Sequence, residues 1–248
     1  MSATAIQVPT RQEIFEKEWE SLFPKQVTDN YTSSITFVKQ LTAVAISTIT
    51  YMKNAFPEES YTNENFAGLQ LKILKQKCAD GLAQFVSASL KQAFEAFDKK
   101  YVHQLALCFY NGECVPENLI EYHIFEYSYN ADGVSLNINS KNRNQNSKRF
   151  SMQAIHNRTV MMIRSLSLFI TTNCHEQLPL NFDISMRIYY TEDTPEDYQA
   201  PGFAECTGPD PVLDTLHTAV CLGRVETPYN KIVARTFVQG VTDTDPEG

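Results

Sequence analysis

The sequence lacks the short motifs that mark common enzyme sites. It has no GxSxG nucleophile elbow, no HExxH zinc helix, no P-loop and no GxGxxG dinucleotide fingerprint. Cys174 and His175 are adjacent, but catalytic pairs come from separate segments of a chain, so adjacency carries no signal. We therefore expect a protein that is not an enzyme, with no cofactor, no metal site and no small-molecule substrate.

Paired cysteines are also missing. The six cysteines include no CxxC pair: Cys78, Cys108, Cys114, Cys174, Cys206 and Cys221. Scattered in this way, they are typical of reduced, mostly buried thiols in an intracellular protein rather than of a disulfide framework or a zinc site.

Long apolar runs and an excess of basic residues are absent as well. The first twenty residues hold six charged side chains, so no signal-peptide core is present. The longest uncharged helical run, Gln40–Met52, is shorter than the roughly 20 residues that a membrane span needs, and we expect no membrane role. The net charge of −8 argues against a basic face covering the whole domain.

Apolar periodicity predicts four helices, at 11–22, roughly 35–55, 80–101 and 152–173. The first is predicted to be a peripheral element that docks or detaches. The last is apolar all round, which predicts burial on more than one side, and Met161 and Met162 suit a surface that repacks against different partners.

Two apolar runs predict a pair of strands, Val102–Tyr110 as a central strand and Leu119–Tyr129 as its return. His123, within the second, is interpreted as a solvent-edge or hydrogen-bonded residue rather than a catalytic one. A further short strand is predicted at 133–138, whereas 61–70 is predicted to be irregular.

The most informative stretch begins at Phe182. Apolar and polar residues alternate from Phe182 to Tyr190, which predicts a strand. From Glu192 to Asp214 there are seven acids, four prolines and no Lys or Arg. A segment of this length without regular structure is usually functional or disordered, yet it returns into two β-rich runs, 215–225 and 231–241. This pattern predicts a strap that lies across something.

Five runs carry a resemblance to a known family. They are FVKQLTAVAISTITYMKNAFPEESY (37–61), LKILKQK (71–77), KKYVHQLAL (99–107), IYYTEDTPEDYQAPGF (188–203) and GRVETPY (223–229). Together they resemble a HORMA domain, and PEDYQAPGF resembles the branch found at the meiotic chromosome axis.

The resemblance implies an α+β fold with three long helices packed on an antiparallel sheet and a C-terminal safety belt that wraps a closure-motif peptide. It implies a peripheral segment at 1–30, a HORMA domain at 31–241 with its belt at about 192–241, and a tail remnant at 242–248. The peptide would extend the edge strand Phe182–Tyr190, beside the helix Met152–Asn173. The implied peptide-binding residues are Asp183, Ser185, Arg187, Tyr189, Met161, Met162, Ser165, Phe169, Val220, Leu222, Val225 and Ile232.

The implied function is capture of closure-motif peptides from the tails of axis HORMA proteins, or of the chain itself, by strand addition. This would support axis assembly, homologue pairing, synapsis and crossover control at the meiotic chromosome axis in the nucleus. An AAA+ remodelling ATPase that engages about residues 1–30 is a further expected partner. Two alternatives stay open: a spindle-checkpoint-type HORMA adaptor, and DNA binding through Lys141, Arg143, Lys148 and Arg149.

Overall fold

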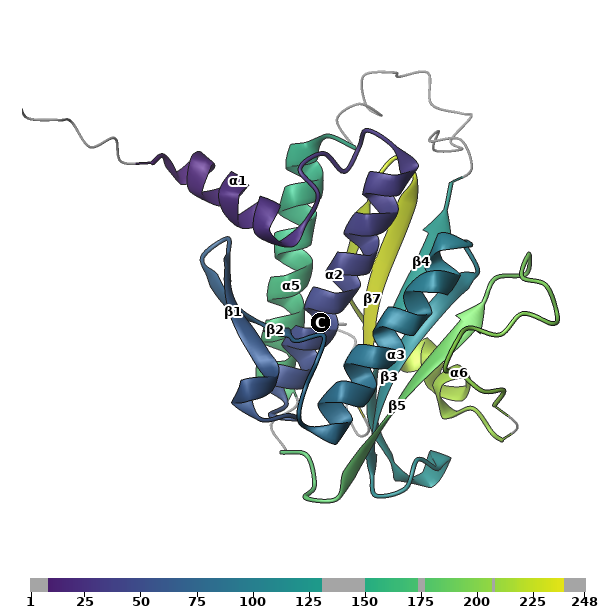
Figure 1. Cartoon of the computed structure of the whole chain (residues 1–248). Helices are drawn as coiled ribbons and strands as arrows, with labels where there is room; N and C mark the ends of the chain where they lie inside the picture. The colour runs from purple at the N-terminus through teal and green to yellow at the C-terminus, as the bar shows by residue number, and fades with distance from the viewer. Residues whose placement is uncertain (1–8, 131–149, 174–176, 207, 239–248) are drawn as a thin grey trace, which may run out of the picture.

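The structure, a computed structural model, describes residues 9–130, 150–173, 177–206 and 208–238. Within this part of the chain, five antiparallel strands form a sheet in the order β5-β3-β4-β7-β6. Three long helices cover one face of it (Figure 1), as predicted. The strands are β3 (Val102–Asn111), β4 (Leu119–Tyr129), β5 (Phe182–Tyr190), β6 (Val220–Glu226) and β7 (Asn230–Val238), and the helices are α2 (Tyr31–Met52), α3 (Gly81–Asp98) and α5 (Met152–Asn173).

Side-chain caps fix where the long helices begin. Asn30 accepts a hydrogen bond from Ser33 N at the start of α2, and Asp80 accepts one from Ala83 N at the start of α3. The helix was predicted to begin at roughly residue 35 but begins at Tyr31, because Asn30 caps it before its apolar face begins. By length and composition α2 could cross a membrane, but 67% of its apolar window is buried inside the fold, as in a core helix.

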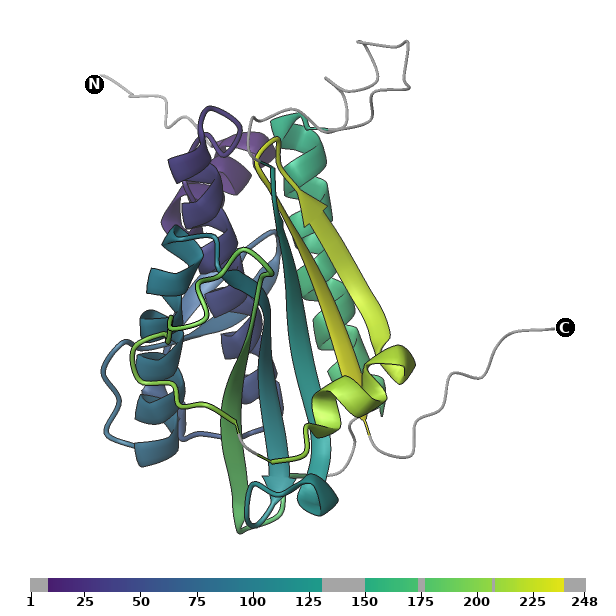
Figure 2. The ribbon, with the colours of Figure 1, turned by 90° about the vertical axis from the view of Figure 1, so that its right-hand side faces the viewer.

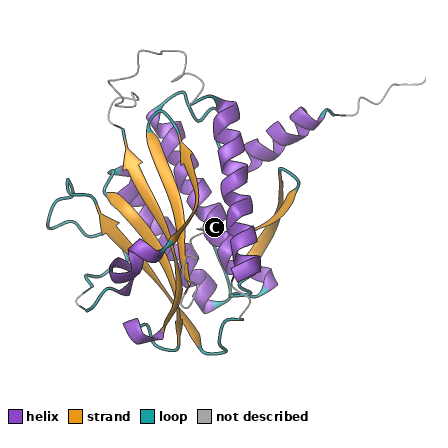
Figure 3. Cartoon of the chain, turned by 180° about the vertical axis from the view of Figure 1, so that it is seen from behind, coloured by secondary structure: helices purple, strands orange, loops and turns teal. Residues whose placement is uncertain are grey.

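The two central strands are buried on both faces, which explains their continuous apolar sequence. The main core lies between the sheet and the three helices. A second, smaller cluster on the outer face packs β3 and β4 against α6 (Pro211–Thr215) and the short helix η3 (Leu216–Thr218). Figures 2 and 3 show α6 on this outer face, opposite the long helices.

The segment predicted to be irregular is a second sheet. A helical turn η1 (Glu58–Ser60) leads into the hairpin of β1 (Tyr61–Phe66) and β2 (Leu69–Leu74). The prediction was wrong because the polar run of β1 lacks apolar alternation. The turn places Ala67 and Gly68 at φ values of 51° and 79°, the pair of positive angles typical of tight hairpins.

The first helix, α1 (Arg11–Leu22), is docked on the fold by aromatic side chains. Trp19 is 1% exposed and stacks 5.6 Å from Phe37, and its indole N–H donates to the Pro24 carbonyl. Glu18 accepts a hydrogen bond from Ala67 N in the β1–β2 turn. The segment predicted to be peripheral therefore contributes one of the most buried side chains of the core, and its boundary at residue 30 stays a prediction.

Several other expectations can be compared with the described residues. His123 is fully buried and hydrogen-bonded to Thr236. The interpretation as a hydrogen-bonded residue is confirmed, and that as a solvent-edge residue was wrong. The five cysteines among the described residues are free, but Cys114, Cys206 and Cys221 are exposed, so the expectation of mostly buried thiols was wrong. Four predictions lie outside the described residues: the strand at 133–138, the basic loop with Lys141, Arg143, Lys148 and Arg149, the Cys174–His175 pair, and the tail at 242–248.

Candidate functional site

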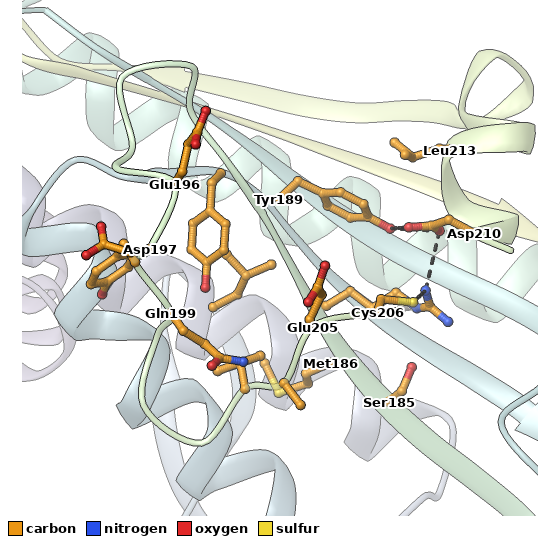
Figure 4. A pocket seen from close by; sticks show the side chains of 16 residues that line it. Ser185, Met186, Tyr189, Glu196, Asp197, Gln199, Glu205, Cys206, Asp210 and Leu213 are labelled. Carbon is orange, nitrogen blue, oxygen red and sulfur yellow. Dashed lines mark hydrogen bonds and ion pairs between the residues drawn. The ribbon is translucent and has the colours of Figure 1, made fainter. Parts of the chain in front are cut away.

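A groove runs along the outer edge of β5. Its volume is about 620 Å³. One wall is β5 from Ser185 to Tyr190. The other is formed by the segment that joins β5 to β6, residues 191–206 and 208–219, which we call the strap (Figure 4). The strap contributes ten of the lining residues: Glu196, Asp197, Tyr198, Gln199, Phe203, Ala204, Glu205, Cys206, Asp210 and Leu213.

β5 is an open edge of the sheet, because β3 is its sole strand neighbour among the described residues. Thr191 N donates to the Tyr101 carbonyl on the β3 side, at 2.8 Å. Backbone groups alternate in direction along an antiparallel strand, so the N–H and C=O groups of Arg187 and Tyr189 also face β3. Those of Met186, Ile188 and Tyr190 then face the groove. No backbone hydrogen bond from the described part of the strap reaches them.

The two faces of β5 give the groove two chemically different sides. Ile184 and Met186 are buried toward α3 in the main core, and Ile188, Tyr190 and the strap's Phe203 pack against the same cluster. Side chains on the opposite face of a strand point the other way. An extended peptide laid beside β5 would therefore place alternate side chains on an apolar side and on a polar side.

Aromatic packing holds the first half of the strap on the helix side. The Tyr198 ring lies 4.9 Å from that of Tyr101 and 5.7 Å from that of Tyr190. Ala200 N donates to the Tyr190 hydroxyl at 2.9 Å. At Gly202 φ is +74°, a left-handed backbone conformation that favours glycine, and the end of the Gln92 side chain on α3 lies close to it.

A carboxylate holds the second half of the strap on the outer face. Asp210 accepts hydrogen bonds from the Tyr189 hydroxyl at 2.8 and 3.0 Å and lies 3.5 Å from Arg187 Nη1. It also caps α6 through Val212 N at 3.0 Å. Burial and the hydrogen bond to Asp210 both raise the pKa of Tyr189, so this hydroxyl stays protonated and able to donate. The strap is thus attached on both sides of the β5 edge.

Acidic side chains dominate the charge of the groove. Glu196, Asp197, Glu205 and Asp210 line it, and Arg187 is the one basic residue among the lining residues. Arg187 is already close to Asp210 and to the Tyr110 hydroxyl. The remaining charge favours a ligand that carries Lys or Arg. Among the described residues, no cluster of three His, Cys, Asp or Glu side chains could hold a metal ion.

A family profile described as "HORMA domain" matches residues 34–230. The chain belongs to the HORMA domain family. Mouse HORMA domain-containing protein 1 is 31% identical over 84% of this chain and 53% of its own length. Bovine HORMA domain-containing protein 2 is 33% identical over 75% of the chain and 60% of its own length. The chain thus spans about half of the first of these relatives.

A solved structure with the same fold is that of C. elegans HTP-2 bound to HTP-3 closure motif 1. The two share 19% identity with a TM-score of 0.72, and the match covers 91% of this chain and 93% of that chain. This likeness supports the HORMA fold described above.

The structure divides the predicted peptide-binding residues into two groups. Ser185, Arg187 and Tyr189 line the groove, and Asp183 lies on the same strand. The other eight lie across the molecule on α5, β6 and β7, and the strand order puts β6 at the edge opposite β5. They are Met161, Met162, Ser165, Phe169, Val220, Leu222, Val225 and Ile232.

The two β-rich runs expected to form part of a belt around the peptide, 215–225 and 231–241, give β6 and β7, and β7 pairs with β4 in a nine-residue ladder. The expected place of α5 beside the peptide needs correction. The α5 helix packs against β6, where Met162 contacts Gly223, and its outer side is open, with Met161 66% exposed. α5 therefore does not flank the groove.

Proposed function

We propose that this HORMA domain captures closure-motif peptides from tails of chromosome-axis proteins, or of its own kind, at the meiotic chromosome axis in the nucleus. The observation that carries the proposal is the groove between the open β5 edge and a strap attached on both sides of it. Strand addition there would give main-chain hydrogen bonds, and the two sides of the groove would select side chains. A structurally similar protein, C. elegans HTP-2, is described as bound to a closure motif.

The path of the strap explains how a captured peptide would be retained. The strap leaves β5 at one edge of the sheet, crosses the outer face through α6 and enters β6 at the other edge. A peptide between β5 and the strap would be enclosed by the chain. Sideways release would require the β6–β7 hairpin to leave β4, and affinity would then reside mainly in slow dissociation. We propose that an AAA+ remodelling ATPase engages about residues 1–30 and forces the β6–β7 hairpin to open.

Retained peptides would link axis proteins to one another, which is the proposed basis for axis assembly, synapsis and crossover control. The function is binding rather than catalysis. The identity of the bound tails would separate this role from that of a checkpoint adaptor.

The test is an array of overlapping peptides that covers the tails of axis and checkpoint proteins, followed by kinetics with the strongest labelled binder. We expect saturation at one peptide per chain and slow release. Asp210→Ala removes hydrogen bonds to a carboxylate, each contributing about 1.5–3 kcal/mol, so release should accelerate by about tenfold or more. Asp214→Ala is the matched control, since that acid is exposed on α6 and does not line the groove. Absence of any saturable axis peptide would refute the proposal.

A further inference from the structure

The turn between β6 and β7 is fastened to α2 by three buried polar side chains. Ser34 Oγ, near the start of α2, lies 2.6 Å from Thr227 Oγ1 and accepts a hydrogen bond from Asn230 Nδ2 at 2.7 Å. Their exposed fractions are 0%, 1% and 2%. We call Ser34, Thr227 and Asn230 the hairpin latch. It joins residues almost two hundred positions apart in the sequence.

The hairpin side of the latch is organised by the turn itself. Thr227 Oγ1 accepts hydrogen bonds from Tyr229 N at 3.1 Å and Asn230 N at 2.9 Å, and Thr227 N donates to the Asn230 carbonyl at 2.8 Å. Thr227 and Asn230 are thus placed before the hairpin meets α2. Ser34 is the one latch residue that comes from outside the hairpin. Removing its hydroxyl therefore tests the attachment of the hairpin to α2 and not the folding of the turn.

Nearby contacts hold the same turn in place. The Tyr229 hydroxyl donates to the Asp29 carbonyl at 3.3 Å, and Asn130 N, just beyond β4, donates to the Tyr229 carbonyl at 2.8 Å. The strap enters β6 at the opposite end of the hairpin. The turn must therefore separate from α2 and β4 before the hairpin can detach from the sheet and release the strap.

Most of the attachment energy of the hairpin does not come from the latch. The nine-residue ladder with β4 and the buried side chains Val225, Ile232 and Ala234 contribute more. Those interactions, however, tolerate a slide of β7 by two residues, which keeps every side chain on its own face. The latch does not tolerate it, because buried polar groups that lose their partners are costly. The latch selects one register and opposes the first step of detachment.

We propose that the hairpin latch sets the rate at which the β6–β7 hairpin opens, and through it the lifetime of a captured peptide. The second half of this statement rests on the function proposed above. Ser34, Thr227 and Asn230 act as positioning residues, since they do not line the groove.

Hydrogen exchange of the full chain without peptide tests the latch directly. Ser34→Ala and Asn230→Ala should each raise the exchange of β6 and β7 amides by about tenfold, the factor that corresponds to about 1.4 kcal/mol, and leave β3, β5 and α3 unchanged. Both substitutions remove the hydrogen bond between Asn230 and Ser34, and Ser34→Ala also removes the contact with Thr227. The double variant should therefore open little faster than Ser34→Ala. Asn230→Ala keeps the test decisive if Ser34→Ala does not fold.

The matched control is Ser47→Ala. Ser47 lies on the same helix and is 2% exposed, and its hydroxyl donates a hydrogen bond to the Ala43 carbonyl and accepts one from Leu74 N on β2 rather than bonding the hairpin. It should loosen β2 but not β6–β7. Exchange in β6–β7 that stays within about twofold of wild type in both latch variants, or rises equally in Ser47→Ala, overturns the proposal.

The rate of peptide dissociation tests the second part of the proposal, that the latch controls peptide lifetime, separately from the proposed function. With a bound axis peptide, Ser34→Ala should speed release by the same factor as it speeds exchange. Faster exchange with unchanged release would refute the control of peptide lifetime while leaving peptide capture intact. If no axis peptide binds at all, the proposed function fails, and exchange alone still decides whether the latch controls hairpin opening.

Discussion

At the scale of single residues, the strap is held by side chains of β5. Tyr189 and Arg187 bind Asp210, and Tyr190 binds Ala200 N. Alternation predicted a strand that contains Tyr189 and Arg187, but it could not show that their partner would be the strap. A carboxylate 21 residues further along the chain gives no periodic signal, because its contact depends on the path of an irregular segment.

We expect His156 to make the docking of α1 sensitive to pH. Its ring lies 4.1 Å from Trp19 and 5.1 Å from Phe15, and burial lowers its pKa below the ordinary 6.5, with Glu16 acting in the opposite sense. The undocked state therefore binds a proton more readily than the docked state. Docking should be complete above about pH 6.5 and weaken progressively as the pH falls below it.

Trp19 is the sole tryptophan, so its emission maximum reports this docking. Below about pH 6.5 we expect a red shift in the wild type, as water reaches the indole, and none in His156→Phe, which keeps an aromatic ring but cannot titrate. An equal red shift in both proteins would show that another group controls α1.

At the scale of elements, the sequence identified strands better than it identified their neighbours. The apolar alternation of Phe182–Tyr190 correctly predicted β5, and the continuous run in β3 correctly predicted a central strand. The β-rich runs at 215–225 and 231–241 became β6 and β7, but their place in the sheet could not be predicted, because periodicity reports which face of a strand is buried and not which strand it pairs with. The all-round apolar character of α5 likewise did not predict its exposed side.

The direction of the β5 backbone predicts which substitution blocks strand addition. The N–H of Ile188 faces the groove, so Ile188→Pro removes a donor to the peptide while sparing the β3 ladder, a position where an edge strand tolerates proline. Arg187→Pro would instead remove an N–H directed at β3 and destabilise the fold. We expect Ile188→Pro to weaken peptide binding by at least about tenfold more than Ile188→Ala, since main-chain hydrogen bonds hold an added strand.

Ile188→Ala is the control because it loses the same side chain and keeps the N–H. The measurements are peptide affinity and thermal stability for all three variants. Equal affinities of Ile188→Pro and Ile188→Ala would mean that the peptide does not pair at this register of β5.

At the scale of the whole molecule, the sheet links the groove to its far edge. The strap joins β5 to β6, and the β6–β7 hairpin completes the sheet on β4. Removing everything after Tyr190 would take two of five strands and expose the buried side of β4. Such a truncation is thus expected to unfold the core rather than merely free the peptide, so opening has to be blocked without deleting the strands.

A cross-link between β4 and β7 would do this. Ser128 and Lys231 face each other across these strands and are both half-buried. Directly opposed residues in antiparallel strands have Cα atoms about 4.5–5.5 Å apart, within the range that a disulfide spans. Ser128→Cys combined with Lys231→Cys should therefore hold the hairpin on β4 when oxidised and release it when reduced.

The order of oxidation and peptide addition decides whether the hairpin is the gate. Oxidation before peptide should slow uptake by at least about tenfold, because an enclosed groove can then be entered only lengthwise, and oxidation after uptake should slow release by a similar factor, the change expected if about 1.4 kcal/mol or more is added to each barrier. Reduction should restore both rates. Wild type oxidised in parallel controls for the native thiols, of which Cys114, Cys206 and Cys221 are exposed. If the cross-linked chain takes up and releases peptide at wild-type rates, the peptide enters and leaves while the hairpin stays on β4, and the enclosing path of the strap does not determine retention.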